Sequence, residues 1–310
     1  IRKSDLQGFN IPGILEKVIV ALFADDTTVY LSNKDSFFDL KVILDLWCKA
    51  STAVFNVEKT EVIPIGSKQY RDAVIETHCI APGQSPLPGY IHIAQEGQTT
   101  RILGSHQGNN VDLVEVWSPV VDSIRAALKR WEKFHLSLNG KRLIAQIVIG
   151  GKIQYLTRAQ TMPEPIKRAI RKIERTFLWG SETSAPVAMD TVCAPPHKGG
   201  MKLIDIDSTV DAIGIIDARD YFNLSDTRPK WAYVGDVVMK EAMRAEDKAR
   251  LPLEFHDALL NPVMHKWKPN ATKLPNTLKN IERIRKKYDI QICAPQPTKE
   301  VRRQMPMWDH

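Results

Sequence analysis

The most constraining stretch of the chain is an apolar run that ends in two adjacent carboxylates. Residues 18–24, VIVALFA, are all apolar, and Asp25 and Asp26 follow at once, before a second β-prone run over residues 27–31. Two short β-prone runs joined by a polar pair predict a β-hairpin with its tip at the aspartates. Because the first run has no polar face, we expect it to form a strand that is covered on both sides.

The two carboxylates allow two interpretations. Like charges at the end of a buried strand repel one another and are costly to desolvate, unless a cation lies between them. Mg²⁺ prefers such oxygen ligands and keeps positions for a substrate phosphate, so a site of this kind can align an attacking hydroxyl with a phosphoryl centre. The alternative is an ordinary turn, since Asp is common in hairpin turns. Taken alone, the four residues from Phe23 to Asp26 favour the turn.

Several short motifs before and after the aspartates favour the metal site over the ordinary turn. Besides Phe23-Ala24-Asp25-Asp26 they are Ile11-Pro12-Gly13, Phe55-Asn56, EKTE at 58–61, Ile102-Leu103-Gly104, Gly108-Asn109, LNGKRLI at 138–144 and TFLW at 176–179. In order and approximate spacing they resemble the boxes of reverse transcriptases from non-LTR, LINE-like retrotransposons, particularly the fungal kind. The first matches the (F/Y)ADD box of the catalytic palm. Each box alone is a weak signal, and the resemblance thins after about Asp220.

The resemblance implies an α+β fold. A partial polymerase palm, made of the β-hairpin and a packed helix, would be followed by a mainly helical thumb and a helical C-terminal extension. The implied palm covers residues 1–118, the thumb 119–180 and the extension 181–310. The implied reaction is Mg²⁺-dependent nucleotidyl transfer by an RNA-directed DNA polymerase, with an RNA template, a DNA primer or target, and deoxynucleotides as partners.

The resemblance also assigns roles to individual residues. Asp25 and Asp26 would bind the metal and carry catalysis, and Lys59 would protonate the departing pyrophosphate as a general acid. For Lys59, a solvated lysine at a turn is the alternative. Leu103 and Gly104 would lie beside the primer terminus.

A polymerase palm needs a third carboxylate from an earlier strand, and the sequence shows no good candidate. The only earlier Asp, Asp5, has no β-prone run around it. We therefore expect a fragment of the polymerase that is inactive on its own. Two other hypotheses stay open, a non-catalytic nucleic-acid-binding remnant of a retroelement and an unrelated metal-dependent phosphotransferase. The second of these would have to explain the whole series of thumb-like boxes.

The net charge of +7 is concentrated in one segment. Residues 1–121 hold 10 basic and 14 acidic side chains, whereas residues 122–180 hold 13 basic and 4 acidic ones, a local net charge of +9. A local excess of this kind is the electrostatic footprint expected of a protein that binds a polyanion. The segment includes Lys141 and Arg142, which we expect to contact nucleic acid.

Five further cations crowd a predicted helix within that segment: Lys167, Arg168, Arg171, Lys172 and Arg175. Like-charge pairs four residues apart each destabilise a helix by ~0.2–0.5 kcal/mol. Only Glu174 lies between them, so we expect a phosphate backbone to compensate the repulsion. A solvated face is the alternative. On this hypothesis, replacing four of the cations by Gln should leave folding intact.

Periodicity predicts the remaining elements. A helix with the apolar stripe Phe37, Leu40, Ile43, Leu44 and Trp47 should be capped by Ser32, Asn33 or Asp35. Strands are expected over 57–65 and 90–93, and at Ile102-Leu103-Gly104. Three thumb helices are expected over 124–131, 144–155 and, opened by Pro163 or Pro165, 166–177, with a turn at Asn139-Gly140. Two more are expected over 208–222 and 278–288.

The cysteines and the apolar runs of the sequence indicate the cellular compartment of the protein. The cysteines Cys48, Cys79, Cys193 and Cys293 lie far apart with no C-x-x-C pair, which predicts free thiols in a reducing compartment and no zinc site. No apolar run approaches the ~20 residues of a membrane span, and no secretory signal opens the sequence. The resemblance implies an intracellular protein that is nuclear, with a cytoplasmic ribonucleoprotein stage.

Overall fold

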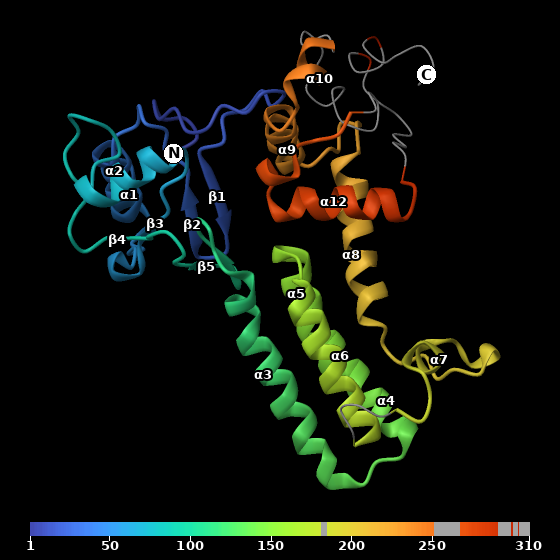
Figure 1. Cartoon of the computed structure of the whole chain (residues 1–310). Helices are drawn as coiled ribbons and strands as arrows, with labels where there is room; N and C mark the ends of the chain where they lie inside the picture. The colour runs from blue at the N-terminus through green and yellow to red at the C-terminus, as the bar shows by residue number, and fades with distance from the viewer. Residues whose placement is uncertain (181–184, 251–266, 291–298, 300–302, 304–310) are drawn as a thin grey trace. The chain divides into compact units, whose positions relative to one another are not determined.

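The computed structural model describes residues 1–180, 185–250 and 267–290, together with Lys299 and Arg303. The described residues form two compact units, Ile1–Val111 and the part of the chain from Asp112 on. Both contain helices, and the first also contains small sheets (Figure 1), so the α+β class is confirmed in this coarse form. The expected boundary between residues 118 and 119 is wrong, because it falls inside helix α3 (Leu113–Trp131).

The predicted hairpin forms at the aspartates. Strands β1 (Val20–Phe23) and β2 (Asp26–Val29) pair antiparallel, and Phe23 faces Asp26 across a two-residue loop of Ala24 and Asp25. The expectation that the first strand is covered on both sides is wrong. In the described structure β1 pairs only with β2, and Leu22 and Phe23 remain 63% and 67% exposed.

Helix α1 (Phe37–Ser51) packs against the base of the hairpin. Leu40 is buried with Leu6 and Ile19, and the rest of the predicted stripe borders that cluster except for Trp47. Trp47 is half exposed and lies against Phe55, with the ring centroids 5.3 Å apart. The cap is Ser36, whose hydroxyl accepts a hydrogen bond from the Phe38 amide.

Asp35, one of the three expected caps, has a different role. Its buried carboxylate accepts hydrogen bonds from the backbone amides of Gln7 (2.5 Å), Gly8 (2.9 Å) and Ser32 (2.7 Å). Burial alone would raise the pKa of Asp35, but these hydrogen bonds lower it below its ordinary value. The carboxylate therefore ties the N-terminal loop to the start of α1.

The rest of the first unit consists of short elements. They are η1 (Val57–Lys59), β3 (Glu61–Val62), α2 (Lys68–Thr77), β4 (His92–Ile93), β5 (Thr100–Ile102) and β6 (Ser105–Gln107). The predicted strand over 57–65 is largely wrong, since only β3 is extended and it pairs in parallel with β4. The strand predicted at Ile102-Leu103-Gly104 is present only as far as Ile102, because Leu103 and Gly104 form the tight turn between β5 and β6.

The second unit is helical, and helices are present at the three positions expected for the thumb. After α3 come η2 (Glu132–Phe134), α4 (Leu138–Ala145), the π-helical η3 (Gln146–Gly150), α5 (Gly151–Gln160) and α6 (Glu164–Trp179). The predicted turn at Asn139-Gly140 is wrong. Both residues lie in the first turn of α4, where the Ser137 hydroxyl accepts a hydrogen bond from the Gly140 amide. Pro163 precedes α6, as predicted.

The chain continues through further helices, of which α8 (Ile206–Tyr221) packs against α5 and α6 of this bundle. These helices are α7 (Met189–Cys193), η4 (Pro196–Lys198), α8, α9 (Lys230–Glu241), α10 (Ala245–Arg250), η6 (Ala271–Lys273) and α12 (Asn276–Lys287). Helix α3 packs along α6, and α8 packs against α12 and α6 (Figure 1). Trp117 of α3 is fully buried and donates its indole N–H to the Thr161 carbonyl. The described helices include none with the length and apolar character of a membrane span.

Candidate functional site

The hairpin tip presents both predicted metal ligands to solvent. Asp25 and Asp26 are exposed, and within the described residues neither carboxylate forms an ion pair or a side-chain hydrogen bond. Ala24 beside them has φ +53°, a left-handed conformation that favours glycine. Two carboxylates suit Mg²⁺, which is commonly bound by one or two carboxylates together with substrate phosphates. No third acidic, His or Cys side chain gathers with them in the part of the chain described.

Lys59, the predicted general acid, lies at the end of η1 in the same unit. Its backbone amide donates to the Asn56 carbonyl, and its side chain is exposed. Over the described ranges no hydrogen bond or ion pair joins it to Asp25 or Asp26. Its role in proton transfer therefore stays a prediction.

The box around Leu103 and Gly104 has a clear structural basis. Both residues have positive φ, +49° and +83°, as the tight turn between β5 and β6 requires. At Gly108 an added Cβ would lie 2.1 Å from the Gln98 carbonyl oxygen, so only glycine fits. The Asn109 side chain donates to the Pro64 carbonyl at 2.8 Å. These residues form a compact local fold, and their place beside a primer stays a prediction.

Lys141 joins two motifs that are far apart in the sequence. Its ammonium donates to the Leu178 carbonyl at 3.0 Å and lies 5.9 Å from the centre of the Phe177 ring. The LNGKRLI and TFLW motifs therefore contact each other in the fold. The neighbouring Arg142 donates to the side chains of Asn139 and Gln146 on α4 and η3. Both cations thus have internal hydrogen-bond partners, which the sequence did not indicate.

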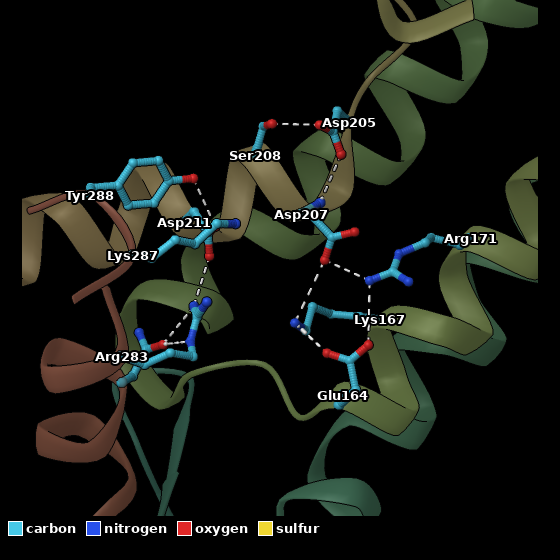
Figure 2. A network of polar contacts seen from close by, with 11 residues as sticks. Glu164, Lys167, Arg171, Asp205, Asp207, Ser208, Asp211, Arg283, Lys287 and Tyr288 are labelled. Carbon is cyan, nitrogen blue, oxygen red and sulfur yellow. Dashed lines mark hydrogen bonds and ion pairs between the residues drawn. The ribbon is translucent and has the colours of Figure 1, made fainter. Parts of the chain in front are cut away.

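Two of the five cations of α6 belong to an ion-pair network with α8 (Figure 2). Lys167 pairs with Glu164 and also lies 3.6 Å from Asp207. Arg171 lies 2.5 Å from Asp207 and 3.4 Å from Glu164. The hydrogen bond from Lys167 is the main cause that lowers the pKa of the Glu164 carboxyl. The sequence offered only Glu174 between these cations, whereas Lys167 and Arg171 find acidic partners in Glu164 and in Asp207 of α8.

The other three cations of α6 are placed differently. Arg168 and Lys172 are exposed, whereas Arg175 is partly buried. Glu174 does not lie among them on the solvent face, since its side chain is buried and one carboxylate oxygen finds no hydrogen-bond partner among the residues that the structure describes. Burial, with a smaller effect of nearby Asp205, raises the pKa of Glu174 to about 8. At neutral pH this side chain is therefore largely uncharged.

Burial and the nearby carboxyl of Glu174 also change the pKa of Cys193. Burial and the neighbouring carboxyls of Glu174 and Asp205 raise the pKa of Cys193 to about 12, and its thiol faces the Ile204 carbonyl. Among the described residues the free thiols are Cys48, Cys79 and Cys193. Cys293 lies outside the described residues.

A second cluster on α8 extends the network to α12. The buried carboxylate of Asp211 accepts from Arg283 (2.7 Å), Lys287 (2.5 Å) and the Tyr288 hydroxyl (2.9 Å), as Figure 2 shows. Burial alone would raise the pKa of Asp211, but these three donors lower it. Nearby lies a cavity of about 220 Å³ bordered by Lys167 and Arg283. Both cations already face carboxylates, so the network joins helices and forms no open anion site.

The acidic residues of α8 are what sequence reasoning missed. Asp207 pairs with Lys167 and Arg171, Asp211 with α12, and Asp217 and Asp220 with Arg158 of α5. The signal was present in the sequence, because the helix predicted over 208–222 contains three of these aspartates and Asp207 directly precedes it. Because Asp207, Asp217 and Asp220 pair with cations of the basic segment, its net charge of +9 does not produce one uniformly basic surface.

Comparison with known protein families gives no match for this sequence, and comparison with curated proteins gives none either. The assignment to a class of protein therefore depends on the order of the short motifs and on the geometry of the residues described above.

Proposed function

We propose that this chain supplies the palm hairpin and the thumb of an RNA-directed DNA polymerase of the LINE-like kind. The observation that carries the proposal is the hairpin tip. A non-glycine residue, Ala24, adopts a left-handed conformation there, directly before two exposed carboxylates. Backbone strain of this kind costs of order 1–3 kcal/mol and gathers at functional sites. An ordinary turn would place Gly or Asn at such a position.

In this proposal Asp25 and Asp26 hold Mg²⁺, which supplies charge stabilisation at a phosphoryl centre when it is bound. The chain's own contribution is the exposed position of the two carboxylates on a short antiparallel pair of strands. Leu103 and Gly104 present a tight turn of backbone toward a primer, and the solvent-exposed Lys59 provides a proton donor. RNA template, DNA primer and deoxynucleotides are the proposed partners.

The second candidate is a nucleic-acid-binding module without catalysis. It is favoured by the local excess of positive charge over residues 122–180 and by the solvent-exposed Arg168 and Lys172 on α6. Both candidates predict binding of nucleic acid that weakens with salt. They differ in whether the carboxylates at the hairpin tip act on it.

Affinity cleavage with Fe²⁺ tests the first candidate without requiring turnover. Fe²⁺ takes the place of Mg²⁺ at oxygen ligands and, with peroxide and ascorbate, cuts nucleic acid close to where it is bound. We expect the primer strand of an RNA–DNA hybrid to be cut near its 3′ end by the parent chain. Asp25→Asn combined with Asp26→Asn should abolish this cut.

The matched control is Asp5→Asn combined with Asp39→Asn, which removes two exposed carboxylates from the same unit. It should leave the cut unchanged. Equal cutting by the parent and by the hairpin variant would refute the metal site. Primer extension complements this test, since DNA synthesis that is lost in Asp25→Ala would establish a polymerase. In the cleavage experiment, binding of the hybrid without any localised cut would favour the second candidate.

A further inference from the structure

The end of helix α3 carries two large aromatic side chains in an unusual position. Trp131, the last residue of α3, is 39% exposed, and Phe134, the last residue of η2, is 65% exposed. Their ring centroids lie 5.6 Å apart with the planes tilted by 50°. Single exposed apolar residues are ordinary. Two aromatic rings in contact with each other and still open to solvent are a more specific feature.

Three cations lie next to this aromatic pair in the sequence. Lys129, Arg130 and Lys133 are exposed, and in the described part of the chain none of them forms an ion pair. Residues three apart share a side of a 3₁₀ turn, which Glu132–Phe134 forms, so Arg130 is on the side of Lys133 as Trp131 is on the side of Phe134. The one acidic residue in the group is Glu132. This distinguishes the group from Lys167 and Arg171, whose charges are met by Asp207.

A purely structural explanation accounts for only part of the group. Cations near the C-terminal end of a helix interact favourably with its dipole. That effect explains Lys129, Arg130 and Lys133, but it gives no reason for exposing Trp131 and Phe134. The rings need a partner that is flat and apolar, while the cations need one that is negatively charged.

We propose that Trp131, Phe134, Lys129, Arg130 and Lys133, here called the α3 end platform, bind single-stranded nucleic acid. The two rings stack on successive bases, and the three cations contact the phosphates. Stacking of this kind accepts any base, because every base has a π face. The inference rests on the proposed function in one respect, since it assigns a strand-binding surface to a chain that we propose acts on nucleic acid.

The test measures binding of labelled oligo(dT) and oligo(rU) to the full chain over a salt series. Phe134→Ala should weaken binding about tenfold with an unchanged salt slope, since stacking on one ring is lost but no phosphate contact is. Replacing Lys129, Arg130 and Lys133 together by Gln should lower the slope by about 2, because each single-strand phosphate contact contributes ~0.7. Trp131→Phe should bind nearly as tightly as the parent, and Trp131→Ala more weakly.

Matched controls come from exposed residues of the first unit. Phe38→Ala removes an exposed aromatic ring, and the combined change of Lys3, Lys34 and Lys49 to Gln removes three exposed cations. Both should change affinity less than twofold. Phe134→Ala provides the decisive comparison even if Trp131→Ala fails to fold, because the Phe134 side chain is largely solvent-exposed.

Each outcome decides between the two proposals. If the parent binds but the platform variants match their controls, the platform is refuted while the proposed function stands. If the platform variants bind more weakly and no cut at a primer end is found with Fe²⁺, the platform stands without the polymerase. Absence of any binding by the parent overturns both. Phe134-dependent binding to vesicles of phosphatidylserine and phosphatidylcholine, without oligonucleotide binding, would identify a membrane contact and overturn the platform.

Discussion

The guanidinium of Arg171 in α6 lies 2.5 Å from the carboxylate of Asp207 at the start of α8. This contact joins the basic segment of the chain to an acidic helix that follows it in sequence. It also reduces the number of cations on α6 that a polyanion could reach. The charge that α6 presents to a polyanion therefore depends on acidic residues in α8 as much as on basic residues in α6.

Replacing Asp207 by Asn tests this relationship. The change removes one of the two acidic partners of Arg171 and of Lys167, so we expect the affinity for RNA–DNA hybrid to rise severalfold at low salt. Stability should fall by less than ~1 kcal/mol, since ion pairs at this degree of exposure contribute little. Binding assays and urea denaturation measure the two effects. Asp226→Asn, which removes an exposed acid elsewhere in the unit, is the control, and equal affinities for both variants would contradict the prediction.

The buried Glu174 predicts an unusual dependence of stability on pH. Its pKa rises from 4.5 to about 8 on folding, so between these values the folded chain keeps a proton that the unfolded chain releases. The free energy of unfolding should therefore decrease as pH rises from about 4.5 to about 8. One pKa unit corresponds to about 1.4 kcal/mol, so the total decrease amounts to several kcal/mol.

Glu174→Gln removes that titration. We expect the variant to match the parent at pH 5 within ~1–2 kcal/mol and to be clearly more stable at pH 9, as measured by urea denaturation across pH. Some decrease should remain, because burial also raises the pKa of Asp217 to about 6 although Arg158 lowers it. Glu132→Gln, at an exposed site, should leave the profile of the parent unchanged. If the free energy of unfolding of Glu174→Gln falls with pH as steeply as that of the parent, the Glu174 carboxyl is ionised in the folded chain.

The strain at the hairpin tip can be measured directly. Ala24→Gly should stabilise the first unit by about 0.5–1 kcal/mol. Glycine removes the cost of about 1–2 kcal/mol that a left-handed conformation imposes on alanine in the folded state. This gain exceeds the ~0.4–1 kcal/mol by which the greater freedom of glycine stabilises the unfolded chain. Ala21→Gly, in the extended part of β1, should instead destabilise it. If thermal unfolding shows the same loss for both variants, the turn at Ala24 is not strained.

A buried ion pair supports the C-terminal helices. The side chains of Arg228 and Asp236 are both nearly inaccessible, with one N–O distance of 2.5 Å, and Arg228 also donates to the Tyr221 carbonyl. Asp236→Asn should cost about 3–5 kcal/mol, because it leaves the guanidinium charge buried without a counter-charge.

Replacing both partners should recover most of that loss, so Arg228→Met with Asp236→Leu is the informative double variant. Arg219→Gln, which removes an exposed partner of Asp220, should cost less than ~1 kcal/mol. Urea denaturation measures each variant. A double variant as unstable as Asp236→Asn would mean that packing around the pair, and not the unpaired charge, dominates.

Features determined by neighbouring residues were predictable from the sequence. The β-hairpin at Asp25-Asp26 and the start of α6 after Pro163 follow from turn chemistry, alternation and the fixed φ of proline. Each depends on interactions within a few residues. The motifs that resemble polymerase boxes also make contacts over long distances in the sequence, such as Asn109 with Pro64 and Lys141 with Leu178.

Burial and charge pairing were decided only by the tertiary structure. The sequence placed Glu174 among solvent-exposed cations, yet packing buries it and raises its pKa to about 8. It predicted a covered strand at Leu22 and Phe23, which stay exposed because β1 has one neighbour in the described structure. It also left Arg171 without the partner that α8 supplies. In each case the environment of a side chain depends on which distant element covers it, and a local pattern contains no information about that element.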